Sequence, residues 1–278
     1  MTRVSVALPT RNGMPYLREA VGSILAQTFP SFELLVIDNA STDGTAEFLA
    51  TVVDPRVRTA RAADGLGLVA VHALAVASTS SELVALMGHD DIAEPTRLAR
   101  QVALLDAEPS VDLVGTWCSM IDLDGRRIGA LHYAVLPDEI RARIVRNTQV
   151  PVPSMLFRRA AYDAAGGFTA ESDYAFDYDL VARLARRRAV ANVPEELVRV
   201  RYNPAGASAV SARRVQRGAL RVRWRTLRAG GYPITEYVWL LKPLAALALP
   251  RWLLRRIIVP YMRWAHGGTT GSPERARR

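Results

Sequence analysis

Short apolar runs alternate with segments of helical periodicity over the first 110 residues, and this alternation constrains the fold more than any other feature. The runs at 4–8, 32–37 and 83–87, with a weaker one at 56–60, are typical of buried strands. Apolar residues recur at helical spacing over 16–26, 42–52 and 68–77. Strands that alternate with helices indicate βαβ units, so we expect an α/β fold with a mostly parallel sheet.

The second half of the chain predicts a more mixed set of elements. We expect helices over 96–105, 138–146 and 176–187, strands over 111–117, 154–157 and 198–202, and a turn at Gly125. For the 42–52 helix, Ser41 or Thr42 is able to act as the N-cap. A stretch rich in Ala, Gly and Ser near 205–212 separates this body from a tail.

Polar clusters follow three of the predicted strands. Pro9 and Thr10 follow the first strand, Asp38 ends the second, and Asp90 and Asp91 come just after the run at 83–87. In open α/β sheets, ligands bind outside the carboxyl ends of the strands. We therefore expect these clusters to meet at one edge of the sheet.

Each acidic cluster has two interpretations. Asp90 and Asp91 suit a hard divalent cation or, together with Glu94, the N-terminus of a helix. Asp38 suits a hydrogen bond from a nucleobase or ribose, or an ordinary Asx turn. Asp177 suits a general base beside a cleft, or a common acidic residue at a helix start.

Composition narrows the class of protein. Half of the residues are hydrophobic, which allows a sizeable core, and Cys118 is the single cysteine, so no disulfide framework is possible. We see no basic leader followed by a long apolar run, and no uncharged stretch of the roughly 20 residues that span a bilayer. These features predict a cytoplasmic protein.

The net charge of +9 comes from the C-terminal region. Residues 213–278 hold 15 arginine or lysine residues against 2 acidic ones, whereas residues 1–212 hold 21 against 25. We expect a helix over 213–228 that carries seven arginines, and an apolar segment over 237–249 that Pro243 would kink. The segment at 251–264 interleaves arginine with Leu, Ile and Trp.

This tail, residues 211–278, is typical of amphipathic helices in a membrane interface, so we expect contact with an anionic membrane surface. Two alternatives are packing against the body and formation of a homodimer. Another class of function, nucleic-acid binding, could use the arginines and aromatic residues of the tail. The acidic rim repels phosphates in the absence of a cation, so we expect no nucleic-acid partner for the body.

The ordered motifs resemble the inverting family 2 glycosyltransferases of bacterial type, which have a GT-A fold. The resemblance covers about residues 2–208 and rests on VALPTRNGMPYLREAVGSILAQTFPSFELLVIDNASTDGT, GHDDI, PTRLARQVALL, and GGF with FDYDL. It implies a Rossmann-like, mostly parallel sheet flanked by helices over 1–210. Residues 1–110 would bind the nucleotide sugar, residues 111–210 the acceptor, and 211–278 would form a helical tail.

The resemblance also implies roles for particular residues. The nucleotide-sugar donor, a UDP- or dTDP-sugar, would be bound by Pro9, Thr10, Asn12, Asp38, Asp90 and Arg201. The D-x-D-type motif maps onto 88–91, where Asp90, with Asp91 beside it, would bind Mn²⁺ or Mg²⁺. Asp177 maps onto the general base. Without the resemblance, Asn12 is an ordinary turn residue and Arg201 an ordinary arginine on an edge strand.

Two positions depart from the family pattern. Gly88 replaces the first acid of the D-x-D motif, and Phe176 replaces the glutamate before the base. We expect transfer of a sugar, with inversion, to a glycan or lipid-linked acceptor in cell-surface polysaccharide or glycolipid synthesis, at the inner face of the cell membrane. A non-catalytic nucleotide-sugar-binding relative is the alternative that these two substitutions leave open.

Overall fold

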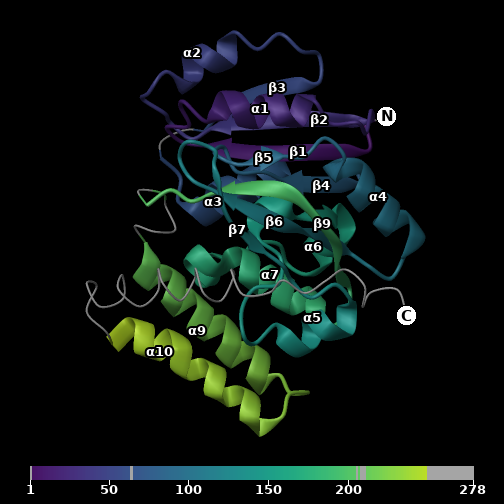
Figure 1. The fold of residues 1–278 in the computed structure, drawn as a ribbon, viewed down its shortest axis with the longest axis vertical. Coiled ribbons are helices and arrows are strands. Elements are labelled where there is room, and N and C mark those ends of the chain that lie inside the picture. Colours follow the sequence, from purple (N-terminus) through teal and green to yellow (C-terminus); the bar gives the residue numbers. More distant parts are fainter. Residues whose placement is uncertain (1, 63–64, 205, 207–210, 249–278) are drawn as a thin grey trace.

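The computed structural model describes residues 2–62, 65–204, 206 and 211–248, and its centre is one mixed sheet (Figure 1). In these residues the strand order is β3-β2-β1-β4-β8-β6-β9-β5, with β7 paired to β6. The strands are β1 (Val4–Thr10), β2 (Phe32–Asp38), β3 (Val57–Arg61), β4 (Leu83–Leu86), β5 (Ile92–Ala93), β6 (Leu113–Ile121), β7 (Arg127–Leu131), β8 (Leu156–Arg158) and β9 (Val190–Arg201).

Helices cover both faces of this sheet. The α-helices are α1 (Leu17–Leu25), α2 (Thr45–Ala50), α3 (Leu68–Ala77), α4 (Arg97–Ala107), α5 (Pro137–Arg143), α6 (Arg159–Ala164), α7 (Phe176–Ala185), α9 (Ala212–Arg228) and α10 (Leu241–Ala248). Short 3₁₀ segments are η1 (Val152–Ser154), η2 (Ala170–Ala175) and η3 (Ile234–Leu240).

Parallel pairing is concentrated in the first half of the chain. Strands β3, β2, β1 and β4 are neighbours and all run parallel, and β6 pairs in parallel with β9. Strands β5, β7 and β8 join antiparallel to their neighbours. The expected α/β class is confirmed, and the carboxyl ends of β1, β2 and β4 lie at the same edge of the sheet.

The strands of the parallel half are buried on both faces. In β1, the side chains of Val4, Val6 and Leu8 belong to one apolar cluster, with residues of α1, α2 and α4. Ala7 and, from β2, Leu35 belong to the other cluster, with residues of α3, α5, α7 and α9. Side chains alternate between the faces of a strand, so this arrangement requires the continuous apolar runs seen in the sequence.

Two elements differ in extent from the sequence-based expectation. Strand β9 begins at Val190, eight residues before the predicted start. Its register with β6 shifts between Thr116 and Cys118, so that bulges in β9 accommodate Pro194 and Glu195 and then Leu197. Helix α2 is shorter than 42–52. It begins after Gly44, which has a φ of 81°, so neither Ser41 nor Thr42 caps it.

Two polar side chains of α4 are fully buried beneath the carboxyl end of the sheet. Nε of Arg97 donates to Oε1 of Gln101 at 3.1 Å. Nη1 of Arg97 donates to Sδ of Met87 at 3.3 Å. Nη2 of Arg97 and Nε2 of Gln101 reach backbone carbonyls in β4, in β6 and just before β8, at distances between 2.7 and 3.2 Å: Leu86, Met155, Val114 and Ser154. This pair therefore connects the helix to the strand ends from which the acidic loop departs.

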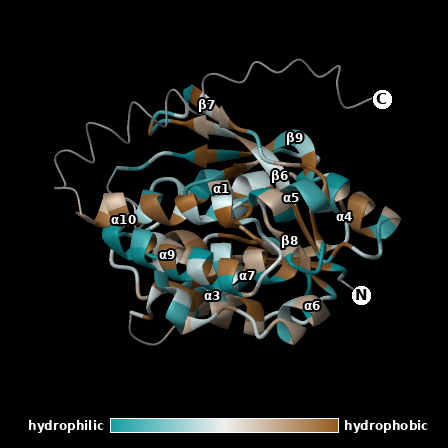
Figure 2. Ribbon diagram, turned by 90° about the horizontal axis from the view of Figure 1, so that it is seen from below, coloured by the Kyte–Doolittle hydropathy of each residue, from teal (hydrophilic) through white to brown (hydrophobic). Residues whose placement is uncertain are grey.

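The basic segment forms the expected helix, and it packs against the body. Helix α9 contacts η2, α7, η3 and α10, and Figure 2 shows it beside α7 and α10. Its Ala219, Val222 and Leu227 are buried in the same apolar cluster as α7. In the described part of the chain no helix is both long and apolar enough to cross a bilayer. The segment predicted at 251–264 lies outside the described residues.

We expect Arg97→Ala to lower the free energy of unfolding by about 3–5 kcal/mol, because it leaves a cavity and removes hydrogen bonds to buried carbonyls. Arg100→Ala is the matched control on the same helix. Its side chain is 59% exposed and pairs with Glu195 at 3.5 Å, which predicts a change of about 0–1 kcal/mol. Urea denaturation measures both. Equal losses in the two variants would contradict the role assigned to Arg97.

Candidate active site

The turn after β1 is fixed to the loop after β2 by side-chain hydrogen bonds. Asn12 has a φ of 52°, a left-handed conformation that asparagine adopts more readily than most residues. Its backbone N–H donates to Oγ of Ser41, and its Oδ1 accepts from the N–H of Thr42, both at 2.9 Å. Asn12 is therefore a turn residue in its geometry, and it aligns the two loops that follow β1 and β2.

Asp38 is a buried residue that uses its two carboxylate oxygens differently. Oδ1 accepts a hydrogen bond from the N–H of Ser41 at 2.9 Å, which is the predicted Asx turn. Oδ2 is buried and receives no hydrogen bond from any described residue. It forms a long ion pair with Nη1 of Arg61, 3.7 Å away. The turn interpretation thus accounts for one oxygen and leaves the other for a ligand.

Thr10 lies directly beside Asp38, since the two residues are paired in the register of β1 and β2. Its Oγ1 is also buried with no hydrogen-bond partner in the described part of the chain. A Cβ on Gly13 would lie 2.4 Å from this hydroxyl, so only glycine leaves it in place. Buried polar atoms are nearly always hydrogen-bonded, so two unpaired oxygens on adjacent strand ends indicate a missing polar ligand.

The loop between β4 and β5 carries the adjacent carboxylates. Asp91 is buried, and its Oδ1 accepts a hydrogen bond from the N–H of Arg201 at 2.9 Å. A Cβ on Gly88 would lie 2.3 Å from Oδ2 of Asp91. The carboxylate of Asp91 therefore fills the space that a side chain at position 88 would need, which explains the glycine in place of the first acid of the motif.

The helix-cap interpretation of Asp91 is wrong. Strand β5 follows Asp91, and α4 begins only at Arg97, after Thr96 and without a side-chain cap. Asp90 and Asp91 therefore lie in the loop between β4 and β5 and not at the start of a helix.

Arg201, at the end of β9, holds the acidic loop. Its side chain is buried, and Nε donates to the carbonyl of Asp90 at 2.9 Å. Nη1 donates to two carbonyls in the turn between β6 and β7, and Nη2 pairs with Glu19 of α1 at 2.6 Å. The guanidinium also lies 4.4 Å from the ring centre of Tyr16. These contacts make Arg201 a positioning residue, and its direct contact with a donor stays a prediction.

The acidic loop fits a hard divalent cation. The carboxylate of Asp90 is half-buried and has no hydrogen-bond partner among the described residues. Burial, and then the charge of Asp90, raise the pKa of Asp91 well above its ordinary value. Two such carboxylates are favourable together when a positive charge lies nearby. The described residues contain no cluster of three or more metal-ligating side chains, so substrate oxygens and water would complete the coordination.

Asp177 lies in the first turn of α7 and is half-buried. Burial raises its pKa to about 6, although hydrogen bonds from backbone N–H groups oppose the rise. Phe176 before it is buried, 4.9 Å from the ring of Phe168 and 4.8 Å from that of His72. The phenylalanine that replaces a glutamate therefore serves as a core residue that anchors the start of α7.

Electrostatic interactions extend between the acidic loop and residues around Asp177. His72, which contacts Phe176, is buried, and burial and nearby His89 lower its pKa to about 4. His89 lies in the acidic loop, and its ring carbon is 3.5 Å from a Cβ position on Gly13. The turn after β1 and the acidic loop are therefore neighbours.

Further electrostatic interactions involve Cys118 and Tyr133. Burial raises the pKa of the Cys118 thiol to about 12, and nearby Asp91 adds to the rise. Burial also raises the pKa of Tyr133 far above its ordinary value, with contributions from nearby Cys118 and Asp177. Sequence reasoning missed Tyr133 and Arg61, because isolated residues between motifs carry no spacing signal. It also missed the roles of Glu19 and Ser41 in fixing these loops.

Comparison with known proteins assigns a family to this fold and site. Residues 5–164 match the family model "Glycosyl transferase family 2". The chain belongs to this family, so the resemblance seen in the sequence is confirmed. It is 25% identical over 215 residues to an uncharacterized glycosyltransferase of Rickettsia typhi, covering 73% of this chain and 64% of that relative. It is 26% identical over 260 residues to EpsE of Bacillus subtilis, which carries a provisional glycosyltransferase name, with 91% and 92% covered.

Solved structures show the same fold. S. aureus TarS 1–349 in complex with UDP-GlcNAc matches with a TM-score of 0.70 at 17% identity, over 94% of this chain and 78% of that chain. The mannosyltransferase PcManGT from Pyrobaculum calidifontis, in complex with GDP-Man and Mn²⁺, matches with a TM-score of 0.59 at 21% identity, over 97% and 76%. The expected GT-A fold is confirmed.

Proposed function

We propose that this protein is an inverting glycosyltransferase that moves a sugar from a nucleotide-diphosphate sugar, a UDP- or dTDP-sugar, to an acceptor hydroxyl. The observation that carries the proposal is the pair of unpaired buried oxygens, Oδ2 of Asp38 and Oγ1 of Thr10, of which Thr10 lies beside the loop that carries Asp90 and Asp91. Membership of glycosyl transferase family 2 supports it, as do the nucleotide-sugar complexes of TarS and PcManGT.

The nucleoside end of the donor would bind at the ends of β1 and β2. Oδ2 of Asp38 would accept a hydrogen bond from an N–H of the base or a hydroxyl of the ribose, because an ionised carboxylate only accepts. The hydroxyl of Thr10 would donate a hydrogen bond to the nucleoside or accept one from it. Pro9 and Asn12 would shape the wall of this site. Such pairing would satisfy both orphan oxygens.

The diphosphate end would lie at the acidic loop. Asp90, with Asp91 beside it, would hold Mn²⁺ or Mg²⁺, and the Mn²⁺ of PcManGT supports this choice of ion. A divalent cation bound there would neutralise the negative charge that develops on the leaving diphosphate. Arg201 would keep the loop in place, because its Nε donates to the backbone carbonyl of Asp90 and its backbone N–H donates to the carboxylate of Asp91.

Asp177 would act as the general base. Its carboxylate takes the proton of the acceptor hydroxyl while that oxygen bonds to the anomeric carbon. The bond from this carbon to the diphosphate oxygen breaks, and the diphosphate leaves with the electron pair. Attack from the face opposite to the leaving group inverts the configuration. A base with a pKa of about 6 is ionised at neutral pH and still basic enough to accept the proton.

We expect Asp177→Asn to lower the rate of nucleoside diphosphate release by about 10²–10⁴-fold, because the amide cannot accept the proton. Donor affinity should stay unchanged, since Asp177 lies away from the nucleoside end. In the wild type, activity should fall as the pH drops through about 6, since protonation removes the base, and should reach a plateau above it. Nucleotide-sugar turnover with water or added sugars as acceptors measures both.

Asp138→Asn is the matched control, because Asp138 is an exposed carboxylate of α5 that pairs with Arg188. It should leave rate and pH profile unchanged. Wild-type turnover in Asp177→Asn would exclude Asp177 as the base. Donor binding without any turnover in the wild type would instead support the non-catalytic alternative.

A second part of the proposal concerns location. Four apolar side chains of η3 and α10 are exposed and define an apolar stripe: Ile234 (79%), Val238 (56%), Leu241 (60%) and Leu244 (46%). Trp224 of neighbouring α9 is 49% exposed, and arginines surround it in the sequence. Apolar side chains beside basic ones suit an anionic membrane surface. Peripheral binding at the inner face of the membrane would bring the site to a glycan or lipid-linked acceptor of surface polysaccharide or glycolipid synthesis.

We expect the full chain to co-sediment with anionic vesicles at low salt, and the variant with Ile234, Val238 and Leu241 changed to Ser to lose most of this binding. Val53→Ser is the control, because Val53 is 96% exposed on the body and lies outside the stripe. Equal binding of the triple variant and the control would exclude the stripe as the membrane contact. A concentration-dependent rise in mass without vesicles would indicate the homodimer instead.

A further inference from the structure

The segment that leads into Asp177 has an unusual backbone. Within η2, Asp173 has φ 47° and ψ −130°, a region that residues other than glycine rarely occupy. Such a conformation costs about 1–3 kcal/mol and persists only where surrounding contacts impose it. The contacts on this segment therefore decide how the first turn of α7 is presented.

Helix α9 makes contacts on the N-terminal side of Asp177. Arg214 donates from Nε and Nη2 to the two carboxylate oxygens of Asp173, at 2.9 and 2.8 Å. One turn later, Gly218 packs against η2 so closely that a Cβ would lie 2.6 Å from the carbonyl oxygen of Ser172. The same Cβ would lie 2.8 Å from Cβ of Ala175. The unusual turn is thus pressed against α9 and held by a bidentate ion pair.

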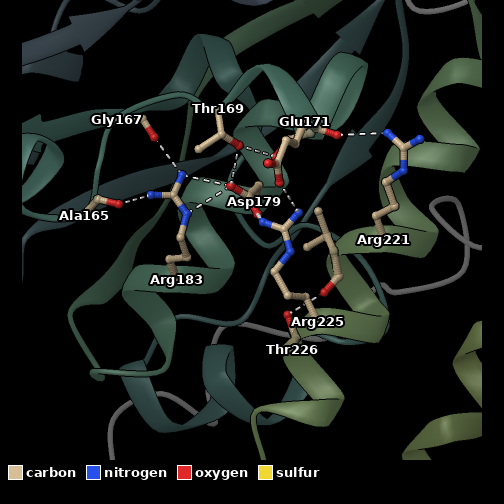
Figure 3. Close-up of polar contacts among 11 residues, drawn as sticks. Ala165, Gly167, Thr169, Glu171, Asp179, Arg183, Arg221, Arg225 and Thr226 are labelled. Atoms are coloured by element: carbon tan, nitrogen blue, oxygen red, sulfur yellow. Dashed lines mark hydrogen bonds and ion pairs between the residues drawn. The ribbon is translucent and has the colours of Figure 1, made fainter.

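The same helix makes a second set of contacts on the C-terminal side of Asp177. Figure 3 shows two guanidinium groups that converge on the buried carboxylate of Asp179. Arg183 of α7 donates at 3.0 Å, and Arg225 of α9 donates to the other oxygen at 3.2 Å. Arg225 also pairs with Glu171 of η2 at 3.5 Å.

We propose that α9 is a positioning clamp for the general base, with Arg214, Gly218 and Arg225 as the residues that hold the segment 171–179. This inference rests on the role proposed for Asp177. The clamp contacts residues four positions before and two positions after Asp177, and no hydrogen bond or ion pair within the described residues links α9 to Asp177 itself. Arg214 and Arg225 therefore act through the backbone of the segment, and a displacement of about 1 Å at a reacting group can cost about 10²-fold in rate.

The clamp can be loosened without unfolding the protein. The side chain of Arg214 is 54% exposed, and exposed ion pairs contribute only about 0–1 kcal/mol. Asp179 keeps Arg183 as a partner when Arg225 is removed, so no buried charge is left alone. The glutamine variants should therefore fold, and a loss of rate in them reports on geometry.

The test compares the double variant Arg214→Gln/Arg225→Gln with the control Arg217→Gln, an exposed arginine on the same helix. The assay is release of nucleoside diphosphate from UDP-GlcNAc or the nucleotide sugar that stabilises the protein most, with water as acceptor. We expect kcat to fall about tenfold or more in the double variant, with donor KM within about twofold of the control. Arg225→Gln alone should show part of this loss, and Arg225→Lys should recover part of that rate.

Amide hydrogen exchange gives a readout that does not need activity. We expect faster exchange over residues 169–178 in the double variant than in Arg217→Gln, with unchanged exchange in β1 and β2. A kcat equal to that of the control, or a parallel loss of kcat and donor affinity, would overturn the clamp. If the wild type released no nucleoside diphosphate from any nucleotide sugar, the proposed function would fail. Unchanged amide exchange over 169–178 in the double variant would overturn the clamp, whatever the activity.

Discussion

The burial of Arg97 and Gln101 under the strand ends is the constraint on which the rest of the site depends. A buried guanidinium is tolerated only when its donors are satisfied. Here Nε of Arg97 donates to Gln101, Nη1 donates to Sδ of Met87, and Nη2 donates to backbone carbonyls. Burial lowers the pKa of Arg97 to about 10, and nearby Asp91 opposes that change. The guanidinium of Arg97 and the carboxylate of Asp91 therefore favour each other's charged forms.

Much of the parallel half could be predicted from the sequence because its signals are local. Helix α3 spans 68–77 as expected, and β1, β2 and β4 start where the apolar runs start. Strand β9 was underestimated because Pro194 and the residues after it break the apolar pattern, and only a partner strand with a bulge makes them part of a strand. The Asx turn of Asp38 was predictable from its position. The unpaired oxygen of Asp38 was not, because burial at one atom depends on neighbours far along the chain.

The high positive charge of the C-terminal region obscured, in the sequence, the apolar residues that pack it against the body. Seven arginines over 213–228 dominate the composition of α9, and they predicted a tail that is separate from the body. The helix nevertheless carries apolar residues at helical spacing, and Ala219, Val222 and Leu227 join the core cluster of α7. Several of its arginines are used within the protein, since Arg223 donates to the carbonyls of Val145 and Arg146. This use leaves fewer arginines for nucleic acid and makes α9 part of the folded body.

In the proposed mechanism, Asp38 and the acidic loop form one nucleotide-diphosphate site that a divalent cation completes. Calorimetric titration of UDP, dTDP and GDP, each with Mn²⁺ or with EDTA, tests this most directly in the wild type and in Asp90→Asn. We expect the wild type to bind at least one of these nucleotides, Mn²⁺ to strengthen this binding at least about tenfold, and Asp90→Asn to remove the gain. Equal affinity with Mn²⁺ and EDTA, or an undiminished Mn²⁺ effect in Asp90→Asn, would contradict it.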